Sequence, residues 1–272
     1  MSDDRKYAQL GRPRRVWAVG AIHGEATRLA ALHDDIGRRF QAGDRLVYLG
    51  NMIGRGPAVR DTLDELLSFR RYVLAIRGAV VTDIVYLRGG QEEMWQKLLQ
   101  LQFAPDPAAV LQWMVGQGLD STLAAYGGNA MHGLASARDG AVTLARWTGE
   151  LRAALRAAPG HDNLLSAVRR CAYTSSEDRA PTDLLFVNAG LDPAKPLHMQ
   201  GDVFWWGGSS FARLAGPYNG FRRVVRGYDP THGPGPTVTD FSASLDGGAG
   251  FGGRLICACF APDGHLLERV EA

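Results

Sequence analysis

The chain has 272 residues, a formal net charge of +2 and three cysteines. Its length is enough for one α/β domain with a well-buried core, and the balanced charge gives no broad footprint for nucleic acid or an anionic membrane. No apolar run approaches the roughly 20 residues that a membrane helix needs. Cys171, Cys257 and Cys259 lack a metal-ligand spacing. We therefore expect a single domain, residues 1–272, in a reduced cytoplasmic protein.

The first part of the chain repeats a unit of strand, glycine-rich loop and helix. Strands are predicted at Arg15–Val19, Arg45–Leu49 and Asp83–Leu87, because each is a short, largely apolar run followed by glycines. Apolar residues at helical spacing follow the loops, through Leu29, Leu32 and Ile36, over Val59–Phe69 and over Glu92–Leu101. Three such units favour a layered α/β fold with its functional site at the carboxyl ends of the strands.

The later part of the chain divides into helices and then strands. Residues 102–182 are expected to form a mostly helical cap insertion, with helices at Ala108–Tyr126 and Ala141–Ala158. Strands are predicted at Leu184–Val187, Arg223–Val225 and Leu255–Phe260. Residues 1–15 are polar and basic and are expected to be a flexible N-terminus of the same domain.

Five short motifs lie at or near the ends of the predicted strands: Gly20–Gly24 (GAIHG), Gly50–Pro57 (GNMIGRGP), Arg88–Glu92 (RGGQE), Asn188–Pro193 (NAGLDP) and Gly227–Pro230 (GYDP). In order and spacing they resemble GDxHG, GDxxDRGP, RGNHE, HAGLDP and GHTP of the phosphoprotein-phosphatase branch of the calcineurin-like metallophosphoesterase superfamily. Segments 113–127, 195–205 and 245–255 extend the resemblance over about residues 16–260. The chain is most similar to bacterial serine/threonine phosphatases and symmetrical diadenosine tetraphosphatases.

The resemblance implies a four-layer α/β/β/α sandwich with a helical cap. It also implies the positions of the metal ligands. In the family, Asp, His and Asn side chains at these positions bind two divalent cations, and one carboxylate bridges both ions. The matching positions in this chain are Ala21, His23, Asn51, Gly90, Gln91, Asn188 and Tyr228. Only His23 keeps the family's ligand type, so the metal-binding motifs are degenerate.

Charge balance argues against a dinuclear metal centre at these positions. Two dications need negative ligands, whereas Asn51, Gln91 and Asn188 offer only neutral amide oxygens. Tyr228 would have to lose a phenol proton whose ordinary pKa is about 10. We expect no metal cofactor.

The groups that the family uses for proton transfer and phosphate binding are also replaced. The general acid His corresponds to Gln91, which cannot protonate a leaving group, and its partner Asp corresponds to Gly54. An arginine of the family falls on Gly207. No catalytic residue is therefore predicted.

Three residues remain as candidates for binding an anion: Arg55, Arg88 and His23. The arginines can form bidentate contacts with an oxyanion or, equally well, internal salt bridges with Asp192, Asp229 or Glu92. For His23, a histidine that is hydrogen-bonded within its loop is favoured over a residual metal ligand, because metal sites need several converging ligands.

Two tryptophans and the other histidines complete the candidates. Trp205 and Trp206 would point to opposite faces if they lay on a strand, and packing is the commoner use of such residues than stacking on a base. The remaining histidines lack a metal-type spacing and are expected at the surface.

Three hypotheses for the function follow. The leading one is a pseudophosphatase that acts by binding a protein partner or a phosphorylated small ligand. The first alternative is a weak or unusual phosphoesterase acting on phosphoprotein or dinucleoside polyphosphate. The second alternative is a purely structural subunit whose cleft is filled by its own side chains.

Overall fold

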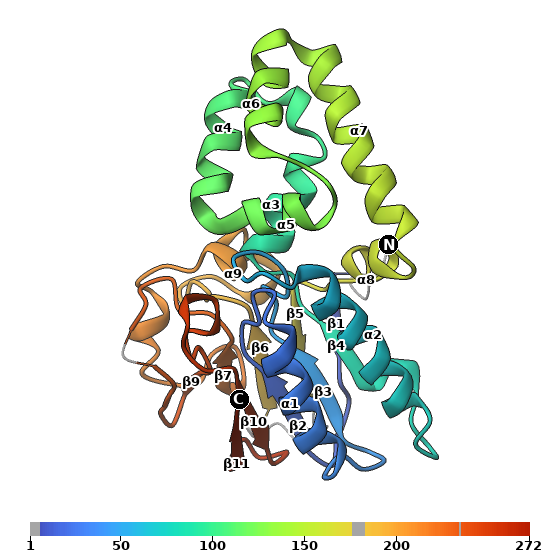
Figure 1. Ribbon diagram of the computed structural model, residues 1–272. Coiled ribbons are helices and arrows are strands. Elements are labelled where there is room, and N and C mark those ends of the chain that lie inside the picture. Colours follow the sequence, from blue (N-terminus) through green and yellow to red (C-terminus); the bar gives the residue numbers. More distant parts are fainter. Residues whose placement is uncertain (1–5, 176–182, 234) are drawn as a thin grey trace.

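The computed structural model describes residues 6–175, 183–233 and 235–272 (Figure 1). Its core holds two β-sheets. The five-stranded sheet has the order β11 (Leu266–Glu271), β10 (Ile256–Phe260), β2 (Val16–Val19), β3 (Arg45–Tyr48) and β4 (Ile84–Tyr86). The six-stranded sheet has the order β1 (Tyr7–Gln9), β5 (Cys171–Tyr173), β6 (Asp183–Val187), β7 (Phe221–Arg226), β9 (Ser242–Ser244) and β8 (Thr237–Val238).

Alternating side chains of the strands separate the layers. On β2, Val16 and Ala18 belong to the apolar cluster between the sheets, whereas Trp17 and Val19 pack toward the helices. This period of two is what a strand buried on both faces requires. The helices on the outer face are α1 (Ala26–Gly37) and α2 (Val59–Leu74).

The opposite face of the second sheet is covered by the segment that follows β6. Its helices are η5 (Leu197–Met199), α9 (Val203–Trp206) and η6 (Phe211–Arg213). Phe204, Trp205 and Phe211 of this segment form an apolar cluster with Leu185 and Val187 of β6. The arrangement is consistent with the expected four layers.

A helical cap stands above the carboxyl ends of β2, β3 and β4 (Figure 1). After η2 (Val81–Asp83), β4 leads into α3 (Gly90–Leu98), and the cap then consists of η3 (Leu101–Phe103), α4 (Pro107–Met114), η4 (Val115–Leu119), α5 (Asp120–Ala125), α6 (Ala130–Asp139), α7 (Ala141–Ala157) and α8 (His161–Ser166). No helix in the described ranges is both long enough and apolar enough to cross a membrane.

Several elements differ from the sequence predictions. Residues 7–9 of the segment expected to be flexible form β1, which pairs in parallel with β5, and β5 itself lies within the expected cap range. The helix predicted over Ala108–Tyr126 is interrupted by a π-helical turn, where Gly118 adopts a φ of 91°. Trp205 and Trp206 lie on a short helix and not on a strand. Residues 176–182 of the expected cap are outside the described residues.

Candidate functional site

Four of the five motifs, all except Asn188–Pro193, line a cleft of about 250 Å³ at the carboxyl ends of the parallel strands. The cap closes it from above through Trp113 of α4 and Gln117 of η4. The polar and aromatic residues that line the cleft include His23, Asn51, Arg55, Gln91, Gln117, Trp113, Trp205, Trp206, Tyr228 and His232. The hypothesis of a purely structural subunit expects a cleft that is filled by its own side chains. The open volume of this cleft disfavours that hypothesis.

Four residues of the cleft have a left-handed backbone conformation. The φ angles are 54° at His23, 53° at Asn51, 58° at Arg55 and 50° at His232. This conformation is uncommon for residues other than glycine and is held in place by surrounding contacts, here including hydrogen bonds from His23 N to Asn51 O (2.7 Å) and from Arg55 N to Gly118 O (2.8 Å). Such backbone strain concentrates at functional sites in proteins.

Glu92 organises the floor of the cleft. Its buried carboxylate accepts hydrogen bonds from the backbone N–H groups of Asn51, Met52, Ile53 and Gly89 at 2.7–3.3 Å. Burial raises the pKa of this carboxyl group, and the backbone donors oppose that rise. Glu92 therefore fixes the second and third motifs to each other and does not pair with either candidate arginine.

Asn51 and Gln91 use their amide groups within the protein. The Asn51 Oδ1 atom accepts from the backbone N–H of Gln91 (3.0 Å). The Gln91 Nε2 atom donates to the Gln117 carbonyl (2.8 Å), which ties α3 to the cap. A side chain at Gly54 would collide with that of Gln91, so the Gln91 side chain occupies the space beside Gly54.

His23 is almost fully buried beside a cation. Burial, the Arg55 guanidinium and His232 lower the pKa of its imidazole to about 3, although the nearby Ile53 carbonyl opposes the shift. Neither ring nitrogen makes a hydrogen bond of normal geometry with any described residue. The ring contacts Tyr228 and Phe251 edge-on, at centroid distances of 5.7 and 6.4 Å.

The two candidate arginines have different environments. Arg55 lies in the cleft, with its guanidinium 4.2 Å from the centroid of Phe251, and forms no salt bridge with the residues described. Its Nε atom, like the Trp205 Nε1 atom in the same cleft, is buried without a hydrogen-bond partner in the described chain. Arg88 instead pairs with Glu93 at 2.9 Å and does not line the cleft.

The structure therefore brings His23 and Arg55 together and leaves Arg88 outside. The internal salt bridge considered for the arginines is present only at Arg88, and its partner is Glu93. The carboxylates that the sequence suggested have other contacts: Asp229 pairs with Arg226, Asp192 with Lys195, and Glu92 with backbone donors.

The remaining matched positions contribute little negative charge. Ala21 is a buried apolar residue, and the backbone at Gly90 is covered by the Trp206 ring. Asn188 donates from Nδ2 to the Leu49 carbonyl (2.6 Å), while burial raises the pKa of the Tyr228 phenol. Tyr228 is thus kept in its neutral form at physiological pH.

These residues do not fit a pair of divalent cations. No Asp or Glu lines the cleft, and the described chain holds no group of three or more His, Cys, Asp or Glu residues that could bind a metal ion. The Arg55 guanidinium adds a positive charge where the ions would need negative ligands. The lining residues therefore supply no carboxylate to offset the charge of two dications.

Sequence reasoning missed part of the cleft. The surface position expected for the other histidines was wrong for His33 and His161, which are buried. His232 is exposed, as expected, but it also lines the cleft together with Trp113 and Gln117. The signal at Trp113 was available, because this residue begins a segment that resembles the family. Gln117 lies in the same segment, on η4. His232 reaches the cleft through the path of its loop, which no local pattern encodes.

Comparison with known proteins supports the fold but not a sequence family. Sequence comparison gives no match, either to a family profile or to a curated protein. Among solved structures, the chain is similar to a "putative diadenosine tetraphosphatase" at 18% identity, covering 98% of each chain, with a TM-score of 0.58. The chain has a calcineurin-like phosphoesterase fold.

Two further phosphatases share this fold. A protein serine/threonine phosphatase from Saccharomyces cerevisiae, similar to human phosphatase PP5, matches at 10% identity over 98% of this chain and 82% of its own, with a TM-score of 0.50. A cold-active protein tyrosine phosphatase matches at 10% identity over 100% and 83%, with a TM-score of 0.52. At these identities the likeness describes the architecture alone.

Proposed function

We propose that the protein is a pseudophosphatase that binds a phosphorylated ligand in the cleft next to Arg55. The observation that carries this proposal is the charge of the cleft: one guanidinium without a carboxylate partner and no acidic residue among the lining residues. Buried polar atoms are normally paired, so the unpartnered Arg55 Nε and Trp205 Nε1 donors are suited to an incoming oxyanion.

The size of the cleft limits the ligand. Its volume of about 250 Å³ is below the range of about 300–1,000 Å³ that drug-sized ligands occupy. A phosphoryl group on a short stem fits this space better than a dinucleoside polyphosphate. Trp113 and Trp206, which are partly exposed and meet edge-on at 5.6 Å, are placed to contact whatever carries the phosphoryl group.

The alternative of weak hydrolysis has less support. An imidazole with a pKa of about 3 is a poor general base at neutral pH, and Gln91 cannot act as an acid. If the alternative is correct, purified protein will contain stoichiometric Mn, Fe, Zn or Mg and will hydrolyse an aryl phosphate or diadenosine tetraphosphate in a manner that His23→Ala abolishes. That result would overturn the pseudophosphatase proposal.

The binding test uses thermal unfolding of the full chain in inorganic phosphate and in phosphoserine at constant ionic strength. We expect both to raise Tm, and Arg55→Gln to remove the effect because it removes the guanidinium that lies over Phe251. Arg77→Gln, an equal charge change at an exposed turn, is the matched control and should behave as the wild type. Equal shifts in Arg55→Gln and wild type would contradict the proposal.

Restoring the family's residues tests whether the five substituted positions correspond to the metal ligands of the family. A variant with Asp at 21 and 51 and His at 91, 188 and 228 should be less stable than the wild type without metal, because it buries unpaired carboxylates. Mn²⁺ should raise its Tm but not that of the wild type. A folded variant, checked by circular dichroism, that binds no Mn²⁺ would show that the loops do not superpose on those of the family.

A further inference from the structure

A second cavity, larger than the cleft, lies between the edges of the two sheets. It has a volume of about 650 Å³ and shares no lining residue with the cleft. Its walls come from β1, β4, α2 and α8, which lie together on the right of Figure 1. This volume falls within the range of about 300–1,000 Å³ of small-molecule sites.

Most of the wall is apolar and held in place by the core. Ile84, Tyr86 and Leu164 line the cavity and are otherwise nearly buried. The Tyr86 ring stacks on Tyr48 at a centroid distance of 5.1 Å and an interplanar angle of 7°. Val81, at the mouth, is 62% exposed. A rigid aromatic and aliphatic wall with an exposed apolar mouth is suited to an apolar ligand body.

The charged residues of the cavity are both arginines. Arg70 comes from α2, and Arg169 lies just before β5. No acidic residue lines the cavity, and neither arginine forms a salt bridge among the residues that the structure describes. Arg169 uses Nη1 to donate to the Ala167 carbonyl (2.9 Å), which leaves its other N–H groups for a ligand. The charge of the cavity is therefore complementary to a negative headgroup.

The adjoining sheet edges offer little room for an extended peptide. β1 and β4 are terminal strands of three residues each. Part of the β4 edge is already paired, since Arg169 N donates to the Tyr86 carbonyl (2.8 Å) and Arg88 N donates to the Arg169 carbonyl (2.7 Å). A small molecule is thus favoured over a peptide that adds a strand.

We propose that this cavity binds an anionic amphiphile. A carboxylate or phosphate monoester headgroup contacts Arg70 and Arg169, and its apolar body lies against Tyr86, Leu67 and Leu164. The site is separate from the Arg55 cleft, and the proposal stands whether or not the cleft binds a phosphoryl group.

Calorimetric titration of the full chain tests the proposal with decanoate and decyl phosphate below their micelle concentrations. We expect saturable binding of one or both, no binding of decyltrimethylammonium, and no heat at this site from inorganic phosphate in an Arg55→Gln background. The double variant Arg70→Gln/Arg169→Gln should weaken binding at least about tenfold, because both charge-assisted contacts are lost.

Two further variants separate binding in the cavity from adsorption at the surface. Arg71→Gln/Arg77→Gln makes the same charge change at exposed positions outside the cavity and should bind as the wild type. Ala167→Phe, which fills the mouth without changing charge, should also weaken binding. The proposal is overturned if decyltrimethylammonium binds as tightly as decanoate, if only an acidic peptide binds, or if the Arg70/Arg169 variant keeps wild-type affinity while folded.

Discussion

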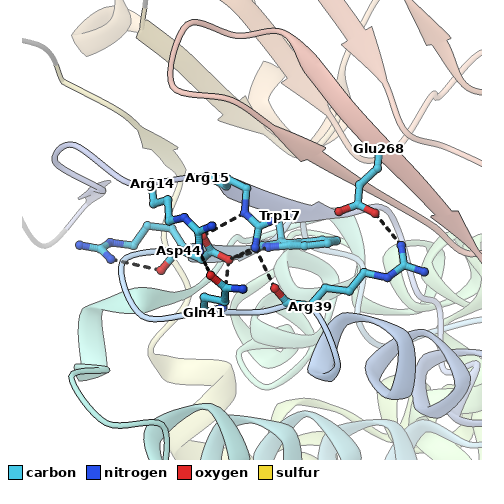
Figure 2. Close-up of polar contacts among 8 residues, drawn as sticks. Arg14, Arg15, Trp17, Arg39, Gln41, Asp44 and Glu268 are labelled. Atoms are coloured by element: carbon cyan, nitrogen blue, oxygen red, sulfur yellow. Dashed lines mark hydrogen bonds and ion pairs between the residues drawn. The ribbon is translucent and has the colours of Figure 1, made fainter.

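Buried polar side chains are hydrogen-bonded differently at the two ends of β2 and β3. At the amino ends, the fully buried Asp44 carboxylate accepts from Arg15 (2.7 and 3.2 Å), from Trp17 Nε1 (3.2 Å) and from the Gln41 backbone N–H (3.1 Å), as Figure 2 shows. At the carboxyl ends, His23 and Arg55 leave ring and guanidinium atoms without hydrogen bonds to described residues.

This contrast separates a structural polar cluster from a binding site. A complete network rigidifies the fold, whereas unpartnered buried atoms cost stability unless a ligand or water completes them. In the same sheet, the buried Asp44 carboxylate is hydrogen-bonded, whereas Arg55 Nε and the His23 ring nitrogens have no hydrogen bond to the described residues. The difference is the reason for placing the proposed ligand site in the cleft.

The largest loss of stability is expected at the amino ends of β2 and β3, where the Asp44 carboxylate is hydrogen-bonded. Asp44→Ala should lower the free energy of unfolding by about 3 kcal/mol, because it leaves the Arg15 guanidinium and the Trp17 indole N–H without their acceptor. Urea denaturation measures this change. Asp35→Ala, which removes an exposed helical ion pair with Arg38, is the control and should leave the midpoint unchanged. A comparable loss of stability in both variants would contradict the structural role given to the Asp44 cluster.

The next prediction is a change in the free energy of unfolding with pH, caused by His23 at the carboxyl ends of the strands. His23 has a folded pKa of about 3, below its ordinary value of about 6.5, so the unfolded chain takes up the proton first as pH falls. Its contribution to stability is complete above about pH 6.5 and is lost toward pH 3, with about 2 kcal/mol gone at pH 5. His23→Asn, which tolerates the positive φ, should flatten this part of the pH profile. Parallel profiles of unfolding free energy would argue against a buried neutral imidazole.

The smallest expected quantity is the coupling free energy between Gly54 and Gln91, which contact each other at the cleft. Gly54→Ala should destabilise the protein by about 2 kcal/mol, because its φ of 84° disfavours a side chain and the new Cβ collides with Gln91. Adding Gln91→Ala should recover about half of that loss. A double-mutant cycle from denaturant melts measures the coupling, and strictly additive values would mean that the two positions do not interact.

The sequence predicted the elements whose pattern is local. The β2, β3 and β4 strands, the helices that follow them and α7 lie within a few residues of their expected bounds, because apolar period and flanking glycines determine them. The resemblance predicted the two-sheet fold and placed His23, Asn51 and Gln91 at one cleft.

Other features depend on contacts that are distant in the sequence. β1 is three residues long and exists through pairing with β5, more than 160 residues later in the chain, so its own residues carry a weak signal. The partner of Arg88 is Glu93, which lies beside Glu92 in the first turn of α3. Choosing it over Glu92 required the loop geometry that directs Glu92 to four backbone donors. His232 reaches the cleft through a loop path that only the tertiary structure defines.

The tryptophans around the cleft give the protein an internal optical reporter. Three of its six indoles, Trp113, Trp205 and Trp206, line the cleft, whereas Trp17, Trp95 and Trp147 are buried elsewhere. A phosphorylated ligand that enters beside Arg55 will change the polarity around half of the chromophores that dominate the emission spectrum. Binding can therefore be followed by intrinsic fluorescence without attaching a dye.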